Sequence, residues 1–319
     1  MDNKSWKGHI AAIFCIFVWG TTFISTKVLL KTFSPIEILF IRFIIGYTAL
    51  WLAFPRRLRL LERKHELYFA AAGLCGVTLY FLFENIALTF TLVSNVGVIV
   101  SISPFFAAFL AGIFLRGERP GVRFFLGFVI AMAGIYLLSF SNTSEVNINP
   151  LGDFLAAAAA FIWAVYSTIT KKISAFGYHT ILVTRRIFFY GIIFMLPALF
   201  IMGFQVNIRE LTAPINLFNI LFLGLGASAL CFATWNYAVK LLGTVKTTVY
   251  IYLVPVITAV TSVLVLHEII TKESAIGIVL TILGLLLSES KSFARYRNKE
   301  RVKFVQKNET VEYSSSSND

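Results

Sequence analysis

A chain of 319 residues with 58% hydrophobic and only 14% charged residues has a mean hydropathy of +0.80, whereas soluble proteins carry about a quarter charged residues. This composition excludes an ordinary soluble protein and indicates an integral membrane protein. The net charge of +12 would indicate nucleic-acid binding in a soluble chain, but here the basic residues lie in short gaps between apolar runs, so no nucleic-acid partner is expected.

Ten apolar runs are long enough to cross a membrane, because a helix needs about 20 apolar residues to span the hydrocarbon core. The runs are continuous rather than alternating, which predicts helices and excludes a β-barrel. We therefore predict an all-α integral membrane protein with ten transmembrane helices. The predicted spans are 9–30, 35–54, 67–90, 92–115, 122–140, 152–173, 179–202, 215–239, 244–266 and 273–290.

The segments outside the spans are predicted from their composition. Lys4 and Lys7 precede the first span, but no small-residue cleavage site follows it, so we expect a retained helix rather than a signal peptide. The remainder, 291–319, is predicted to be a basic, disordered cytoplasmic tail.

Lysine and arginine are distributed unevenly between the gaps. The gaps after spans two, four, six and eight and the tail carry most of them: Arg56, Arg57, Arg59, Arg63, Lys64, Arg116, Arg119, Arg123, Lys171, Lys172, Lys240, Lys246, Lys291, Arg295, Arg297, Lys299, Arg301, Lys303 and Lys307. The other side has only Lys27, Lys31, Arg209 and Lys272. Because cytoplasmic loops are enriched in basic residues, both termini are predicted to be cytoplasmic, in a multi-pass protein of the cell (plasma) membrane.

The sequence contains an internal repeat. Spans one and six align at an offset of 144 residues, the difference between Trp19 and Trp163, and this offset also matches Arg42 with Arg186. At offsets of 150 and 151 further pairs match: Asn85 with Asn236, Pro104 with Pro255, Gly127 with Gly277, and Gly134 with Gly284. We predict repeat one over 1–145 (helices 1–5) and repeat two over 146–290 (helices 6–10).

Each repeat has an odd number of spans, so the second must be inserted upside down relative to the first. This arrangement predicts a pseudo-twofold axis in the membrane plane, a site near the midplane and alternating access between the two halves. Pro104 and Pro255 should bend their helices at equivalent places.

The stretch Phe17-Val18-Trp19-Gly20 resembles the opening motif of the EamA-like branch of the drug/metabolite transporter (DMT) superfamily. The paired Asn, Pro and Gly positions named above resemble the family's signature in helices three to five and its second copy. The resemblance covers about residues 8 to 288 and departs from the pattern at Ala164, where the second copy lacks the glycine. It implies ten helices, a central cavity between the repeats, and export or exchange of metabolites, often amino acids or related compounds.

Polar residues follow one face of the first span and of its repeat copy. Trp19, Thr22 and Thr26 share a helix face, and Trp163 and Tyr166 occupy matching positions. One interpretation is a cavity wall. The alternative is that the hydroxyl groups hydrogen-bond between helices and the tryptophans face lipid.

Glu84 is the only acidic residue deep within a predicted span, and Tyr80 and Asn85 flank it. Intramembrane acids face a cavity or a partner, and a buried carboxyl that keeps its proton would suit proton coupling. At 1.5 Å per residue, Glu84 lies roughly 9 Å and Arg42 roughly 10 Å below the outer ends of their spans. Two readings stay open: a substrate or proton site at Glu84, and a structural ion pair with Arg42.

The second repeat offers weaker candidates. Arg186 has no acidic residue at matching depth, so we expect it to reach helix carbonyls or lipid headgroups, with an anionic substrate group as the alternative. Asn236 and Tyr250 are further candidates for the cavity lining.

These observations favour a secondary transporter that exports or exchanges small metabolites, with protons as a possible coupling ion and membrane lipid as its surroundings. The alternatives are a sugar-phosphate or nucleotide-sugar exchanger, which would need clustered cations, and a non-transporting scaffold or sensor. No enzyme, cofactor or metal site is expected, because only four histidines occur and no nucleophile-base or metal-ligand spacing is present.

Overall fold

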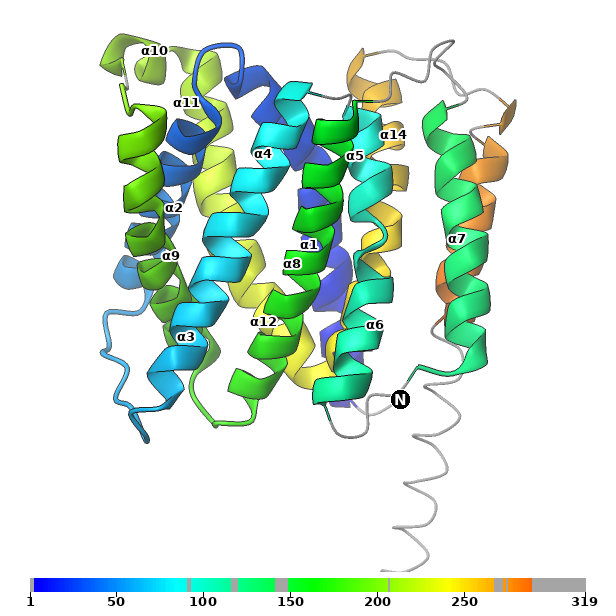
Figure 1. The fold of residues 1–319 in the computed structure, drawn as a ribbon, viewed down its shortest axis with the longest axis horizontal. Helices are drawn as coiled ribbons and strands as arrows, with labels where there is room; N and C mark the ends of the chain where they lie inside the picture. The colour runs from blue at the N-terminus through cyan, green and yellow to red at the C-terminus, as the bar shows by residue number, and fades with distance from the viewer. Residues whose placement is uncertain are drawn as a thin grey trace, which may run out of the picture.

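The computed structural model describes residues 3–90, 93–115, 120–140, 149–205, 207–266, 272–273 and 275–288. The regular secondary structure within these ranges is entirely helical, and the long helices stand side by side (Figure 1). The predicted tail 291–319 lies outside the described residues.

The helices of the first half are α1 (Asn3–Leu29), α2 (Pro35–Ala53), α3 (His65–Gly73), the π-helical turn η1 (Leu74–Leu79), α4 (Tyr80–Phe90), α5 (Val93–Val100), α6 (Ser103–Phe114) and α7 (Val122–Phe140). Those of the second half are α8 (Pro150–Ser174), α9 (Thr180–Met202), α10 (Ile208–Thr212), α11 (Pro214–Leu221), the π-helical η2 (Phe222–Leu230), α12 (Cys231–Leu242), α13 (Thr244–Thr248), the 3₁₀ turn η3 (Val249–Tyr252) and α14 (Leu253–Leu266). A last apolar helix covers Ala275–Ser288.

In the described part of the chain, seven helical stretches are long and apolar enough to cross a membrane. They are Ser5–Leu29, Pro35–Ala53, His65–Phe90, Val96–Phe114, Pro150–Ser174, Thr180–Met202 and Pro214–Leu242. The predicted fifth, ninth and tenth spans fall on shorter apolar helices, Val122–Leu137, Thr244–Ile257 and Ala275–Ser288. An all-α architecture with several membrane-length helices is therefore confirmed.

Local sequence explains where α2 begins. The Ser34 side chain accepts a hydrogen bond from the Glu37 backbone, and the Glu37 carboxylate accepts one from the Ser34 N–H at 2.8 Å, which forms a capping box. Pro35 occupies the first turn, where its fixed φ suits a helix and its missing N–H costs nothing.

Helical irregularities recur at repeat-equivalent positions. The π-helical segments η1 and η2 interrupt the third and eighth predicted spans. A break at Ser101 and Ile102 precedes Pro104, and the η3 turn precedes Pro255. The two prolines therefore lie beside interruptions of their spans, as predicted, because each lacks the backbone N–H that would continue the preceding turn.

The long helices form two bundles. Bundle A comprises α1, α2, α11, η2, α12 and α14, with α1 packed on α12 and α14, and α2 packed on η2. Bundle B comprises α3 to α6, α8 and α9, with α8 packed on α4 and α6, and α9 packed on α3. The bundles meet along α2 and α9 and along α8 and α12.

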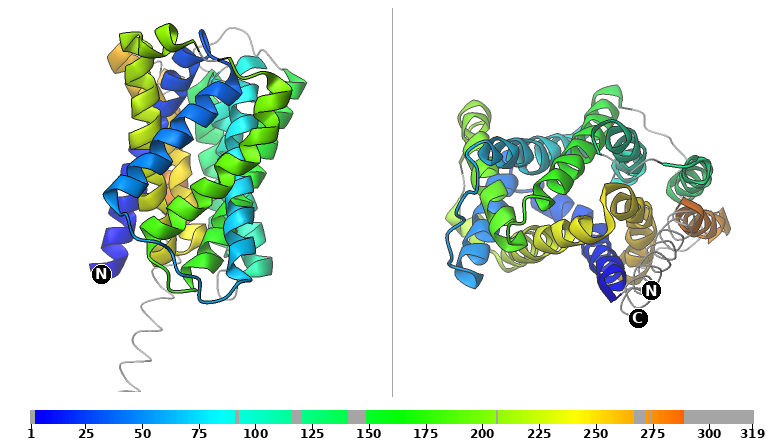
Figure 2. Two further views of the ribbon diagram at one scale, coloured as in Figure 1. Left: turned by 90° about the vertical axis from the view of Figure 1, so that its left-hand side faces the viewer. Right: turned by 90° about the horizontal axis from the view of Figure 1, so that it is seen from below.

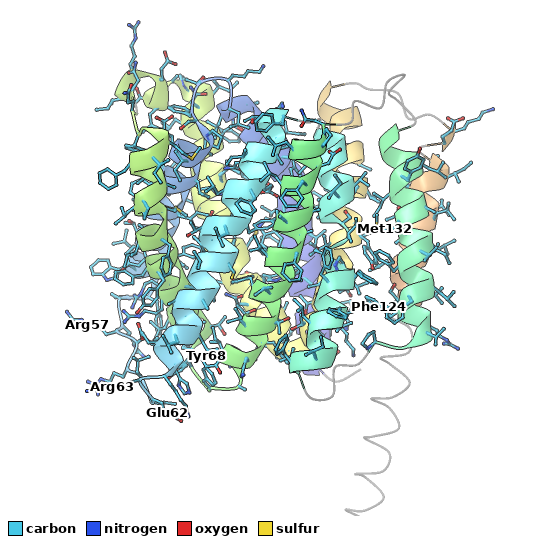
Figure 3. All side chains as sticks on the ribbon, viewed as in Figure 1. Arg57, Glu62, Arg63, Tyr68, Phe124 and Met132 are labelled. Carbon is cyan, nitrogen blue, oxygen red and sulfur yellow. The ribbon has the colours of Figure 1, made fainter. Side chains whose placement is uncertain are left out.

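The pair formed by α7 and the 275–288 helix stands at the edge of the molecule (Figures 1 and 2). Phe124 and Met132 of α7 face the space toward α6 and belong to an apolar cluster with Ala108 and Tyr252 (Figure 3). The α2–α3 connection, which contains Arg57 and Arg63, lies at the same end of the bundle as the N-terminus (Figures 1 and 3). We call this the basic end.

Glycines allow the closest helix approaches. A Cβ added to Gly134 of α7 would lie 2.6 Å from the Gly277 carbonyl oxygen. A Cβ added to Gly284 would lie 2.6 Å from the Gly127 carbonyl oxygen. Both distances are shorter than van der Waals contact and involve backbone atoms, so the two helices would have to separate.

We expect Gly134→Ala and Gly284→Ala each to reduce the stability by about 1 to 3 kcal/mol, because overpacking against backbone cannot be relieved by a side-chain rotation. The melting temperature in detergent measures the effect. Gly112→Ala is the matched control, since its added Cβ meets nothing within 4 Å. An unchanged melting temperature for either test variant would contradict the packing described above.

Candidate functional site

A cavity lies between the two bundles. Bundle A contributes Trp19, Thr22, Phe23, Arg42, Ile251 and Val254 to its lining, counting η3 with α14, and bundle B contributes Tyr80, Phe81, Glu84, Val100 and Trp163. Its volume of about 40 Å³ gives room for about three water molecules. The lining therefore combines two opposite charges with aromatic walls. In this conformation the cavity is too small to hold a metabolite.

Arg42 is held on the bundle A side of this cavity. The side chain is 1% exposed, and its Nε donates to the Ser228 hydroxyl at 2.9 Å. The guanidinium carbon lies 4.5 Å from the centre of the Phe81 ring, a cation–π distance. The positive charge is thus supported by a neutral hydroxyl and an aromatic face.

Glu84 lies on the bundle B side and is 7% exposed. The Tyr80 hydroxyl donates to Glu84 Oε1 at 2.8 Å. Arg42 and Glu84, which both belong to the described residues, do not form an ion pair, unlike Arg186 with Glu66 and Lys64 with Glu62. Of the two readings left open by the sequence, the direct ion pair is not formed, and both charges face the same cavity.

Aromatic rings close the cavity toward the basic end. Trp19 and Trp163, the repeat-equivalent tryptophans, meet edge to face with ring centres 5.3 Å apart. Trp235 lies 5.0 Å from Trp19, and Tyr80 lies 4.8 Å from Trp163. Since Trp19 and Trp235 come from bundle A and Trp163 and Tyr80 from bundle B, the rings bridge the two bundles.

Below this aromatic layer, a buried hydrogen-bond chain joins three helices. The Tyr166 hydroxyl donates to Asn236 Oδ1 at 2.8 Å, and Asn236 Nδ2 donates to the Thr184 hydroxyl at 3.0 Å. Neither Tyr166 nor Asn236 belongs to the residues that line the cavity.

The repeat-equivalent residues of the first half are arranged differently. Thr22 lines the cavity and its hydroxyl donates to the Trp19 carbonyl at 2.7 Å. Asn85 is fully buried; its Nδ2 donates to the Pro35 carbonyl at 3.3 Å, and its Oδ1 has no hydrogen-bond partner.

Two further candidates lie away from the cavity lining. Thr26 is 4% exposed and packs inside the bundle. Tyr250 hydrogen-bonds through its hydroxyl to His9 Nδ1 at 2.6 Å. Neither belongs to the residues that line the cavity.

The expectation for Arg186 was wrong. Arg186 forms an ion pair with Glu66 at the basic end, where its Nε donates to Glu66 Oε1 at 2.6 Å and the Tyr190 hydroxyl also donates to that oxygen. The predicted third span began at residue 67, so Glu66 lay outside the spans in which a partner for Arg186 was sought. Arg186 does not line the cavity.

The structure also adds residues that the sequence did not single out, notably Ser228, Phe81 and Trp235. Trp235 directly precedes the repeat residue Asn236, which was the one sequence signal available for it. Within the described residues, no group of three or more His, Cys, Asp or Glu side chains is placed to hold a metal ion.

Comparison with known proteins agrees with this architecture. The model of the EamA-like transporter family matches residues 6–140 and 150–289. An "uncharacterized transporter" of Archaeoglobus fulgidus is 29% identical over 290 residues, covering 89% of this chain and 98% of the relative. A solved crystal structure superposes with a TM-score of 0.72 at 21% identity, covering 88% of this chain and 96% of the other, which shows a common fold.

Two other relatives have more specific names. A "probable terminal-alkyne amino-acid exporter" of Streptantibioticus cattleyicolor is 26% identical and covers 91% of this chain and 96% of its own. A "probable amino-acid metabolite efflux pump" of Escherichia coli is 25% identical and covers 88% and 94%.

Proposed function

The chain belongs to the EamA-like transporter family, and from this premise we propose that it is a secondary transporter that exports or exchanges amino acids or related small metabolites by alternating access. The family match covers both halves of the chain and confirms the predicted resemblance to the drug/metabolite transporters. A membrane transporter of this type is supported by the apolar helices and by the relatives, while the substrate and the mechanism are our proposal.

The observation that carries the proposal is that Arg42 and Glu84 face one cavity from opposite bundles without pairing. An α-amino acid carries a carboxylate and an ammonium group on the same carbon atom. Its carboxylate would bind the guanidinium of Arg42, and its ammonium group would bind the Glu84 carboxylate. The aromatic walls would accept an apolar side chain, and the names of two relatives mention amino acids.

This arrangement also links binding to movement. A substrate held by Arg42 and Glu84 connects bundle A to bundle B, so binding favours the conformation in which the bundles lie closest. A proton on Glu84 would compete with the substrate ammonium group for the same carboxylate. Exchange of protons for substrate is therefore the coupling that we propose.

We further propose that the ten predicted helices form two inverted repeats. A twofold rotation that exchanges residues 150 apart maps the contact between Gly127 and Gly284 onto that between Gly277 and Gly134. The same rotation exchanges bundle A with bundle B, since α1 packs on α12 as α8 packs on α4. These reciprocal contacts support the repeat, and we propose that its axis lies between the bundles.

Proteoliposomes test the function. They are loaded with a panel of amino acids, nucleobases and sugars, and efflux is measured with and without a pH gradient. We expect efflux of amino acids that the gradient accelerates. Transport of sugar phosphates alone would favour the exchanger instead, and a protein without any substrate or pH response would be a scaffold or sensor.

The proposed topology is that both termini and the basic end face the cytoplasm, in the plasma membrane, because the basic residues gather at that end. Leu60→Cys at the basic end and Glu210→Cys at the other, each in a background without Cys15, Cys75 and Cys231, are the test variants. In right-side-out vesicles, a membrane-impermeant thiol reagent should label position 210 and not position 60. The reverse result would overturn the orientation.

A further inference from the structure

The two ends of the bundle share one bridging contact. At the end opposite the basic end, Lys27 Nζ of α1 donates to the Leu88 carbonyl of α4 at 2.6 Å. At the basic end, Lys171 Nζ of α8 donates to the Val239 carbonyl of α12 at 3.4 Å. These are repeat-equivalent pairs, at offsets of 144 and 151 residues, and each connects bundle A to bundle B.

The two ends differ about one helical turn closer to the cavity than these lysines. Asn236 Nδ2 at the basic end donates across the bundles to Thr184, and Asn85 Nδ2 at the other end donates across them to the Pro35 carbonyl. At the basic end, the Tyr166 hydroxyl adds a further bond between the bundles, to Asn236 Oδ1. At the other end the equivalent residues are Thr22 and Asn85. Thr22 is too short to copy the tyrosine and bonds its own helix, and Asn85 Oδ1 stays buried without a partner.

The tyrosine ring also fills space that threonine leaves open. Tyr166 is fully buried, with its ring centre 5.1 Å from that of Trp163 and 5.8 Å from that of Phe232. Thr22, in contrast, lines the cavity. The cavity thus extends on the side of the threonine and stops on the side of the tyrosine.

We propose that Tyr166 is the gate residue that keeps the basic end closed, and that Thr22 at the equivalent position leaves the opposite end free to open. This inference rests on the alternating access of the proposed function. The two ends are thereby unequal although the repeats are related by symmetry. Opening the basic end requires breaking the Tyr166–Asn236 hydrogen bond and withdrawing a packed ring, whereas at the opposite end Thr22 makes no hydrogen bond to Asn85.

A residue exchange between the repeats tests the gate. Tyr166→Thr, Thr22→Tyr and the double variant are made with Val100→Cys as a reporter in the cavity lining, in a background without native cysteines. A membrane-impermeant thiol reagent is added to either side of sealed vesicles, and the labelling rate of the reporter is measured. No substrate is needed.

Tyr166→Thr should increase labelling from the basic end about tenfold, the effect of losing roughly one buried hydrogen bond with its packing. Thr22→Tyr should reduce labelling from the opposite end by a similar factor, because its hydroxyl can donate to Asn85 Oδ1. Adding Asn85→Leu to Thr22→Tyr should restore part of the labelling. The double exchange should reverse the preference of the parent protein.

Tyr166→Phe keeps the ring and serves if Tyr166→Thr does not fold; it should move labelling in the same direction by less. Phe161→Thr, at an exposed position of the same helix, is the control and should change nothing. Unchanged labelling from the basic end in folded Tyr166→Thr and Tyr166→Phe proteins would overturn the proposal. Reversal of labelling in a protein that transports no panel compound would keep the gate and refute the transport function.

Discussion

Replacing Glu84 by glutamine is expected to reduce gradient-driven efflux about 100-fold, because it removes the charge that we propose binds the substrate ammonium group and the proton. Protein stability should be nearly unchanged. The glutamine side chain keeps the shape of Glu84 and can still accept the hydrogen bond that the Tyr80 hydroxyl now donates at 2.8 Å. Efflux from proteoliposomes with an imposed pH gradient measures the loss, and the melting temperature measures stability.

Two further variants separate the charge from its surroundings. Tyr80→Phe removes the hydrogen bond to Glu84 and leaves the charge, so it should reduce efflux by much less than Glu84→Gln does. Glu210→Gln removes an exposed acidic group far from the cavity and should transport normally. Normal gradient-driven efflux by a well-expressed Glu84→Gln protein would show that the acid has no part in coupling.

The features that the sequence predicted are those that depend on local pattern. Apolar runs of sufficient length predict helices because no other arrangement satisfies the backbone in lipid. The proposed repeat was predicted from matched residues, and two of them, Trp19 and Trp163, pack edge to face with ring centres 5.3 Å apart. The prolines predicted the interruptions of two spans, since the effect of proline acts on its own helix.

Contacts between distant helices could not be predicted in the same way. Arg42 is held by Ser228, which lies in the π-helical segment η2 of the other half of the chain. The length of a π-helical segment changes which residues face a neighbour, and the apolar pattern of the third and eighth spans predicted neither η1 nor η2. Arg186 pairs with Glu66 because its long side chain reaches the first turn of α3. A comparison of depths within the predicted spans does not include that turn.

The sequence likewise predicted only part of the difference between the two ends of the molecule. The pairing of Thr22 with Tyr166 is in the sequence, but its meaning depends on the hydrogen bond from Tyr166 to Asn236. In an alignment of the two halves, the mismatch between Thr22 and Tyr166 has no evident meaning. The Tyr166 ring is fully buried against Trp163, whereas Thr22 lines the cavity, and this difference in packing is the basis of the gate that we propose.

A double-mutant cycle on Arg42 and Glu84 tests the premise that the two charges serve the substrate rather than each other. Breaking a buried ion pair by removing one partner costs about 3 to 5 kcal/mol, and the double change then recovers much of it. Here each charge has its own neutral support, Ser228 for Arg42 and Tyr80 for Glu84. We therefore expect a coupling energy of no more than about 1 kcal/mol between Arg42→Gln and Glu84→Gln in the free energy of unfolding.

In contrast to stability, transport should depend strongly on each of the two charges. Arg42→Gln is expected to raise the KM for amino-acid efflux by about 10- to 100-fold, since a charge-assisted bond to the substrate carboxylate is lost. Arg42→Lys should recover little, because an ammonium group cannot keep both the Ser228 hydrogen bond and a two-point contact with a carboxylate. A coupling energy above about 3 kcal/mol, with a KM unchanged in Arg42→Gln, would assign the two residues to a structural pair and move the substrate site elsewhere.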